Sequence, residues 1–350
     1  MNSTNAKLVH LTLLLCLAAA TLASTAAAQV VVKPKPPKAE KAAVPVVPRT
    51  PEAREMPPVV LNDGSTTEKS IAVDPNANIK ICVLEGNLKI NGWERPEMRV
   101  FVKNGSRVAF RVLEKDPSSN KPVWVLVSNS TSERPGPPQS SECLSGERIE
   151  IDVPMKSTLS VAGRATETMI DSVQKVSVKN AEGNISLRNI PGGITASTLQ
   201  GDVTVENSGG SIQIESSTGN LVAYEVTPGQ IGDLFKAKTS SGAISLQKVD
   251  HRQIEANSIS GSVIFNGKIL PGGLYNFRTS NGSIRLLIPD NSSCTIKASY
   301  GFGNFNSEIP LKFLYRNVTS ESKNLAATLG SGDATIILTT SSGSIGVRKQ

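Results

Sequence analysis

Histidine is scarce in this sequence, and that scarcity limits the acid–base chemistry the chain could perform. The 350 residues contain two histidines, of which His10 lies in the leader described below. A Ser-His-acid hydrolase would therefore have to use His251 as its base. This residue stands in the polar stretch Asp250-His251-Arg252, where we expect a solvated surface side chain. The sequence therefore predicts no catalytic residue.

Carboxylates and cysteines are also poorly placed for catalysis or metal binding. Glycoside hydrolysis needs a pair of carboxylates, but Asp202 and Asp333 belong to different copies of a repeat and each follows a turn-forming glycine. A zinc site needs about four nitrogen, sulfur or oxygen ligands, which one remaining histidine and dispersed cysteines do not supply. Calcium-binding solenoids need an Asp in register in every copy. We therefore predict no metal site and no cofactor.

An aromatic segment is the one place where the sequence indicates a ligand surface. Residues 300–305 alternate aromatic with small residues, which places Tyr300, Phe302 and Phe305 close together. If these rings are exposed, they could stack on sugar rings or anchor a partner. If they are buried, they plug the end of a hydrophobic core. The sequence leaves both interpretations open.

The first 28 residues have the features of a signal peptide. Lys7 precedes an apolar run over residues 8–20, and residues 26–28 are small, so we expect cleavage before Gln29. The run is shorter than the roughly 20 residues of a membrane span, and no later stretch is long and apolar enough to serve as one. The sequence thus predicts export to the cell surface, the periplasm or the medium.

The sequence contains four cysteines. Cys16 lies in the leader, so lipidation is an alternative to simple cleavage, although Leu15 precedes it where a lipoprotein signal has a small residue. Export permits disulfides. Cys82 and Cys143 are the expected pair because both precede the regular repeats, which leaves Cys294 as a buried thiol. Three separate buried cysteines are the other possibility.

Residues 29–69 differ in composition from the rest of the chain. They are rich in Pro, Lys and Ala, which favours an extended polyproline II spacer. This linker carries part of the net charge of +7, and aromatic residues make up 4% of the chain. A nucleic-acid site would need a basic stripe with stacking aromatics. We therefore exclude nucleic acid as a partner.

A six-residue phrase recurs through the rest of the chain: a small or polar residue, Gly, any residue, an aliphatic, a polar residue and another aliphatic. Glycine allows the chain to turn, and the two aliphatics share one face of a strand. One such strand cannot bury its apolar face alone, but stacked copies can. The copies contain Gly86, Gly183, Gly201, Gly210, Gly242, Gly261, Gly282 and Gly343, with a weaker copy at Gly219.

The spacing of these glycines predicts an all-β solenoid with irregular coils. Gly183 and Gly201 are 18 residues apart, and Gly219 and Gly242 are 23 apart, which suits coils with a turn near each half. Stacked strands of a β-sandwich are the alternative. We expect an N-terminal β region or cap over residues 70–154 and a repeat body over 155–350, which an aromatic segment at 294–323 interrupts.

The ordered phrases resemble the bacterial putative-adhesin β-strand repeat family, a domain of unknown function. The opening stretch Gly86–Val100, the Ser-Gly-x-Ile phrases and the ending Leu329–Ile345 carry the resemblance, which covers roughly residues 70–349. It implies a right-handed β-solenoid and, by the family's name, surface adhesion. It supplies no binding residues.

The predicted export signal and the β-strand repeat together predict an adhesin-like protein. It would act as a binding or structural module of the cell envelope and would have no enzymatic activity. An envelope glycan or a surface protein is the expected partner, and the oligomeric state is not specified. One alternative is a β-helical polysaccharide-active enzyme, although the pectinase-like strings Asn-Thr-Asp, Asp-Asp, Gly-His-Gly and Arg-Ile-Lys do not occur. The other is a periplasmic scaffold or regulator in envelope-stress signalling.

Overall fold

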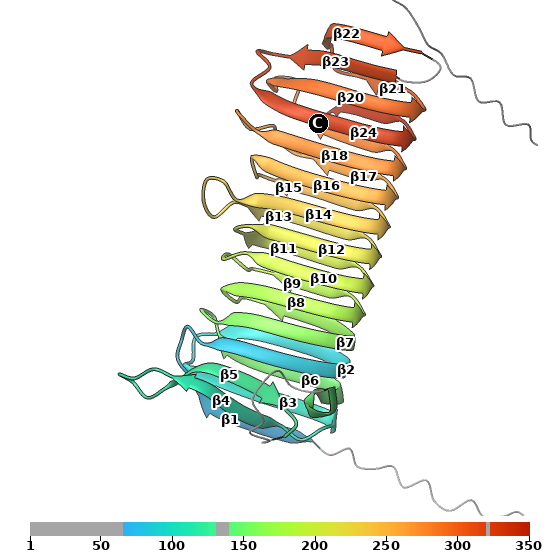
Figure 1. Ribbon diagram of the computed structural model, residues 1–350. Helices are drawn as coiled ribbons and strands as arrows, with labels where there is room; N and C mark the ends of the chain where they lie inside the picture. The colour runs from blue at the N-terminus through green and yellow to red at the C-terminus, as the bar shows by residue number, and fades with distance from the viewer. Residues whose placement is uncertain (1–65, 131–139, 320–322) are drawn as a thin grey trace, which may run out of the picture. The chain divides into compact units, whose positions relative to one another are not determined.

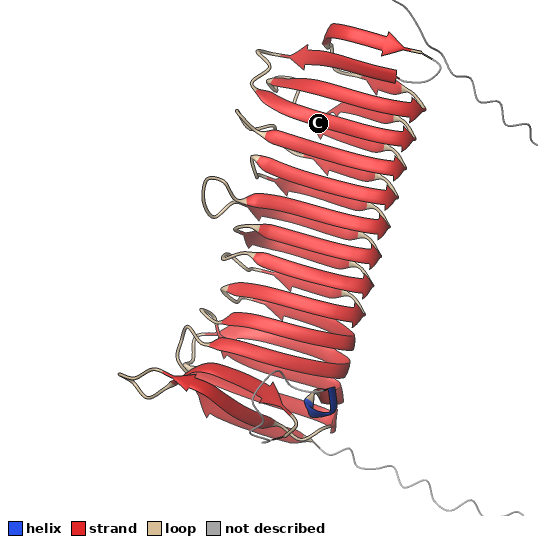
Figure 2. Cartoon of the chain, in the orientation of Figure 1, coloured by secondary structure: helices blue, strands red, loops and turns tan. Residues whose placement is uncertain are grey.

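The computed structural model describes residues 66–130, 140–319 and 323–350. All of them belong to the second of the two compact units of the chain, residues 60–350. The predicted signal peptide, Cys16 and most of the predicted linker lie outside the described residues. Within the described residues, strands account for nearly all of the regular structure (Figure 2), with 25 strands and one short 3₁₀ turn, Ser140–Glu142.

Most strands occur in pairs that form the rungs of a β-solenoid (Figure 1). Each rung places one strand in sheet I, turns at a glycine and places the next strand in sheet II, and parallel ladders join neighbouring rungs. In stacking order, sheet I contains β8 (Lys175–Glu182), β10 (Ile194–Gln200), β12 (Ile212–Thr218), β14 (Leu234–Ser241), β16 (Gln253–Ser260), β18 (Leu274–Asn281), β24 (Ala334–Ser342) and β20 (Cys294–Phe302). Sheet II contains β9 (Ile185–Arg188), β11 (Val203–Gly209), β13 (Leu221–Thr227), β15 (Ile244–Val249), β17 (Val263–Asn266), β19 (Ile284–Ile288), β25 (Ile345–Lys349) and β21 (Phe305–Ser307).

Two long strands continue the stack at its N-terminal end. β2 (Asn78–Trp93) and β7 (Thr158–Asp171) pair from Asn78 opposite Thr158 to Asn91 opposite Asp171 and pass through both sheets. Beyond them, β5 (Pro122–Ser128) and β4 (Ala109–Lys115) extend sheet I, and β6 (Leu144–Pro154), β3 (Glu97–Gly105) and β1 (Thr67–Ala72) extend sheet II. A disulfide joins Cys82 in β2 to Cys143, just before β6. The expected N-terminal region therefore contributes the first rung as well as flanking strands.

The C-terminal end departs from sequence order. β24 inserts between β18 and β20, so the last part of the chain forms an inner rung. Residues 294–307, expected as an interruption, form a further rung, β20 and β21, of the same kind as the others. The cap is the antiparallel hairpin of β22 (Lys312–Val318) and β23 (Lys323–Leu329), which continues sheet I. β22 is the edge strand of this end (Figure 1).

The paired aliphatics of each phrase point inward, as predicted. In β12, for example, Ile212 and Ile214 are fully buried whereas Gln213 between them is exposed. These inward side chains form a single hydrophobic cluster that runs from Val73 to Val347. Neighbouring rungs are offset by 18 residues at Asp202 and by 23 residues at Ala243. The solenoid is therefore confirmed, and parallel stacking of this kind excludes the β-sandwich.

A ladder of hydroxyls supports the glycine corners. Gly201 has a φ of 139°, and a Cβ on it would overlap the carbonyl oxygen of Gly183 in the rung below. Three residues before most corner glycines, a buried Ser or Thr donates to the corner carbonyl of the preceding rung; Thr239 to Gly219 (3.0 Å) is one example. The others are Thr198, Ser216, Ser258, Thr279 and Thr340. These hydroxyls donate hydrogen bonds to carbonyl oxygens that lie at the corners, outside the hydrogen-bond ladders of the two sheets.

Candidate functional site

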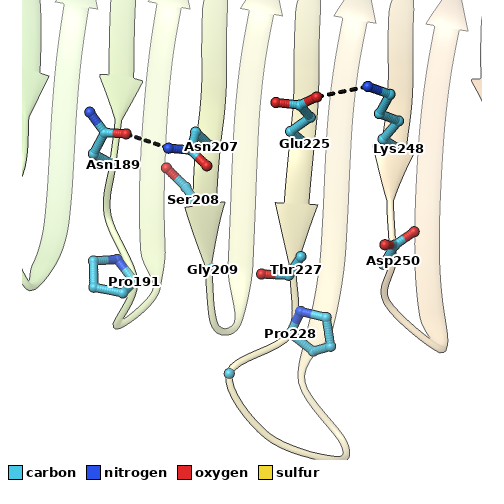
Figure 3. Close-up of a pocket in the computed structure, with 11 residues that line it drawn as sticks. Asn189, Pro191, Asn207, Ser208, Gly209, Glu225, Thr227, Pro228, Lys248 and Asp250 are labelled. Carbon is cyan, nitrogen blue, oxygen red and sulfur yellow. Dashed lines mark hydrogen bonds and ion pairs between the residues drawn. The ribbon is translucent and has the colours of Figure 1, made fainter.

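A groove with a volume of about 640 Å³ crosses the ends of β9, β11, β13 and β15 in sheet II (Figure 3). Its polar lining comes from equivalent positions on successive rungs, and we call it the rung-end groove. The residues that define it are Asn189, Asn207, Glu225, Lys248 and Asp250. A loop between β13 and β14, residues 228–233, borders it.

A residue with positive φ at the same point of each rung produces this row of side chains. Glu206 pairs with Tyr224 and Ser208 pairs with Val226, so the ladder passes over Asn207 and Glu225 without a change of register. The next side chain in each strand, Ser208 or Val226, is buried. The φ values at Asn189, Asn207, Glu225 and Lys248 are 56°, 44°, 53° and 52°.

Two of these residue types are unusual at positive φ. Asparagine adopts the left-handed region comparatively easily, whereas Glu and Lys do so rarely. The stacked rungs nevertheless hold Glu225 and Lys248 in this conformation. Such outliers concentrate at functional sites. The groove is therefore the part of the described chain where backbone geometry most strongly indicates a binding role.

A chain of hydrogen bonds fixes the amide end of the groove. The Asn207 Nδ2 donates to Asn189 Oδ1 (2.6 Å), and the Asn189 Nδ2 donates to Asp171 Oδ1 (2.7 Å). Arg188 also forms an ion pair with Asp171 at 2.6 Å. Burial raises the pKa of Asp171, but hydrogen bonds from Ser172, Arg188 and Asn189 outweigh burial and leave this pKa below its usual value.

An ion pair occupies the other end. Lys248 Nζ lies 2.7 Å from Glu225 Oε1 and 3.3 Å from the hydroxyl of Tyr224 (Figure 3 shows the pair). The hydrogen bond from Lys248 holds the pKa of Glu225 below its usual value, and the same bond raises the pKa of Lys248. Both side chains therefore keep their charges near neutral pH.

Several polar groups of the groove are left uncommitted. Within residues 66–130, 140–319 and 323–350, no hydrogen bond or ion pair engages the Asn207 Oδ1, the Thr227 hydroxyl or the Asp250 carboxylate. Pro191 and Pro228 add apolar surface beside them. The arrangement can donate to and accept from a ligand that carries many hydroxyls.

His251 is not the solvated residue that the sequence predicted. It is fully buried, and its Nε2 donates to the carbonyl oxygen of Gly210 at 2.8 Å. Its ring also packs edge-on against Phe235 at 5.8 Å. The turns that lead from sheet II back to sheet I stack on one another, and we call this stack the corner column. The longer loop 228–233 projects out of the corner column, and the imidazole fills the space that it leaves. Burial lowers the pKa of His251.

The predicted aromatic ligand surface is not assembled in the structure. Tyr300 and Phe305 are buried and lie ring to ring at 6.4 Å at the end of the core, and only Phe302 of the three is exposed, at 83%. The alternation places the first and third rings inward on either side of the Gly303 corner. Of the two interpretations that the sequence left open, burial at the end of the core therefore describes Tyr300 and Phe305, and exposure describes Phe302.

The acidic residues that the sequence singled out have structural partners. Asp202 Oδ1 accepts the Asn220 N–H (2.7 Å), which continues a rung-to-rung file of turn side chains. Asp333 accepts from the hydroxyls of Ser293 and Ser331. No cluster of three or more potential metal ligands occurs among the described residues. Within the same residues, no helix is long and apolar enough to span a membrane.

Sequence reasoning missed the rung-end groove. One signal was present, because Asn189 and Asn207 recur 18 residues apart just after an exposed charged residue. Glu225 and Lys248 gave none, since neither residue type favours positive φ.

Comparisons with known proteins identify the family of this chain. No curated protein matches the chain. Three solved structures are similar to 82% of it. They are a "putative cell adhesion protein" from Clostridium sporogenes (11% identity, 100% of that chain, TM-score 0.21), a "putative lipid binding protein" from Parabacteroides distasonis (14%, 98%, 0.33) and a "putative adhesin" from the same species (12%, 98%, 0.28). Residues 119–348 match a family described as Toastrack DUF4097. The resemblance to an adhesin-like β-repeat family is thereby confirmed, and the chain belongs to the Toastrack DUF4097 family.

Proposed function

We propose that this protein is an exported, non-enzymatic binding module of the cell envelope that recognises a glycan through the rung-end groove. One observation carries the proposal: hydrogen-bonding side chains recur rung by rung along the groove, and within the described chain no hydrogen bond or ion pair engages the Asn207 Oδ1, the Thr227 hydroxyl or the Asp250 carboxylate beside them.

The uncommitted groups favour a ligand with hydroxyls. Asn207 Oδ1 and the Asp250 carboxylate accept hydrogen bonds, and the Thr227 hydroxyl both donates and accepts. Lys248 has three N–H donors, of which Glu225 and Tyr224 engage two. Sugar hydroxyls complement such a mixture.

The charges narrow the class of glycan. Glu225 balances Lys248, which leaves Asp250 as an unpaired anion in the groove. Phosphorylated or otherwise acidic chains would be repelled by Asp250, whereas neutral or amino sugars would not be. Pro191 and Pro228 offer apolar contact to the C–H faces of such rings.

The solenoid supplies rigidity and spacing. Its rungs are separated by about 4.8 Å, the distance between paired strands, so equivalent side chains form a regular row along the axis. A row held by stacked rungs loses little conformational freedom on binding. An extended glycan lying along the axis would contact several rungs at once.

The test is binding to a glycan array that includes neutral, amino and acidic envelope polysaccharides. We expect binding to neutral or amino sugars and at least about a tenfold loss in Asn207→Gly, because one or two hydrogen bonds to the ligand are removed. Glycine keeps the positive φ of this position.

Asn257→Ala is the matched control, because Asn257 is an exposed asparagine on β16 in sheet I, outside the groove. It should bind as the wild type does. Equal binding by Asn207→Gly, binding to no glycan, or shortening of the polysaccharide would each contradict the proposal.

A further inference from the structure

The edge strand β22 exposes several large apolar side chains. All of its seven residues are exposed. Phe313, Leu314, Tyr315 and Val318 are 44–59% exposed although they are large and apolar. We call this strand, together with Phe302 and Lys323, the end surface.

Contacts connect these parts into one surface. Phe313 covers the end of the core, with its ring edge-on to Phe305 at 6.5 Å. At the other end of the strand, Val318 pairs with Lys323 of β23. Lys323 Nζ donates to the carbonyl oxygen of Gly303, next to the exposed Phe302.

The end surface is also positively charged. β22 contains Lys312 and Arg316 and no acidic residue. Arg316 lies over the ring of Phe313 at 5.8 Å and Lys323 over the ring of Tyr300 at 6.0 Å, so aromatic rings rather than carboxylates hold these cations. Glu321, which stands in the sequence between β22 and β23, lies outside the described residues, and Glu308 is paired with Arg348 at 3.5 Å.

The opposite end of the solenoid differs. Its edge strands carry residues of both charges: Glu68 and Lys69 in β1, and Glu114 and Lys115 in β4. Charged side chains on an edge strand are a common protection against pairing with another chain. A second copy pairing with β22 would bring like charges together across the strands, which is unfavourable. The charge of the end surface is complementary to an anionic partner instead.

We propose that the end surface docks on an anionic lipid bilayer at the level of the headgroups. Aromatic and aliphatic side chains would enter the interfacial layer while Lys312, Arg316 and Lys323 contact anionic headgroups, a combination typical of interfacial binding. The backbone groups of the β22 edge stay hydrated there, so no unpaired group enters the hydrocarbon. This docking is independent of glycan binding by the groove.

The test is co-sedimentation of the exported, purified protein with vesicles of phosphatidylcholine, with and without phosphatidylglycerol. We expect binding that requires phosphatidylglycerol and weakens as salt is added. Lys312→Glu/Arg316→Glu should lower the partition coefficient by at least about tenfold, because each cation near an anionic surface contributes to binding. Leu314→Ser/Tyr315→Ser should also lower it, by lost burial of apolar area.

Matched controls exist on the sides of the solenoid. Lys175→Glu/Lys179→Glu reverses two exposed cations of β8 with the same spacing along a strand, and Leu199→Ser removes a 60% exposed leucine of β10. Both should bind vesicles like the wild type, as should Asn207→Gly. The proposal would be overturned if the protein bound uncharged vesicles as well as anionic ones, or if the control variants lost as much binding as the β22 variants. It would also be overturned if the protein bound no vesicles and instead formed dimers that Tyr315→Ser abolishes.

Discussion

The imidazole of His251 donates a hydrogen bond to the carbonyl oxygen of Gly210, 41 residues earlier in the chain, at 2.8 Å. Gly210 precedes β12 and His251 precedes β16, so the bond connects corners that a whole rung separates. The intervening corner is the loop 228–233, in which Asp233 accepts the N–H groups of Gly229 and Gln230. His251 therefore closes the gap that this loop leaves in the corner column.

This burial predicts a pH dependence of stability. Burial lowers the pKa of His251 below its usual value of 6.5, against smaller opposing effects of Gly210, Asp233 and Asp250. Below about pH 6.5, His251 binds a proton more readily in the unfolded chain than in the folded chain. The contribution of neutral His251 to the free energy of unfolding is therefore complete above about pH 6.5 and is lost as the pH falls. We expect the free energy of unfolding to decline by at most about 1.4 kcal/mol per pH unit in that window.

Urea unfolding of the wild type and of His251→Gln between about pH 5 and about pH 8 measures this effect, since glutamine does not titrate. Asp290 does not interfere with this measurement. Its hydrogen bond with Lys349 holds its pKa below the usual 3.8, so its contribution to stability is present above pH 3.8 and is lost only at lower pH. Identical slopes for the two proteins between about pH 5 and about pH 6.5 would show that His251 is not the group responsible.

The corner glycines predict a position-dependent cost of a methyl group. In Gly201→Ala, the new Cβ would overlap the carbonyl oxygen of Gly183, and the φ of 139° is strained for alanine. We expect a loss of about 2–4 kcal/mol. Gly346→Ala is the control, since nothing lies within 4 Å of its Cβ, and strand alanine should stabilise by about 0.5–1 kcal/mol. Chemical denaturation measures both, and similar values for the two variants would refute the overlap.

The hydroxyl ladder predicts opposite effects of the same substitution at two threonines. Thr239→Val removes the donor to the Gly219 carbonyl and should cost about 1–2 kcal/mol. Within the described chain, the buried hydroxyl of Thr166 has no hydrogen-bond partner, so Thr166→Val should be neutral or stabilising. Thermal unfolding of both variants decides the matter, and a destabilised Thr166→Val would contradict this account.

The cysteines predict a defined count of reactive thiols. Cys294 is buried, and burial raises its pKa to about 11, so it should not react with a thiol reagent in the folded protein near pH 8. In protein that lacks residues 1–28, one thiol should appear on unfolding without reductant, because Cys82 and Cys143 are joined. Three thiols under those conditions would mean that the disulfide is absent.

The repeat was predictable because its signal is local. A glycine followed by two apolar residues two positions apart specifies a corner and a half-buried strand. The corner glycines that obey this rule include Gly183, Gly201, Gly219, Gly242, Gly261 and Gly282. The Ser or Thr three residues before the glycine was also visible and marks the hydroxyl ladder. The phrase at Gly210 is the exception, since it starts β12 at the opposite corner.

The remaining features depend on contacts between rungs. The burial of His251 follows from the length of the loop before β14, and the position of β24 follows from the hairpin that returns the chain. The row of residues with positive φ combines Asn with Glu and Lys, so residue type does not reveal it. No periodicity in a single strand encodes these relationships.

The location of ligand protection tests the central claim most directly. Hydrogen–deuterium exchange would be measured on the full chain with and without the tightest-binding oligosaccharide from the glycan array. The groove account predicts slower exchange in residues 225–233 and 248–252, and no change in β22. Protection confined to the end surface, or to the outer face of sheet I, would contradict it.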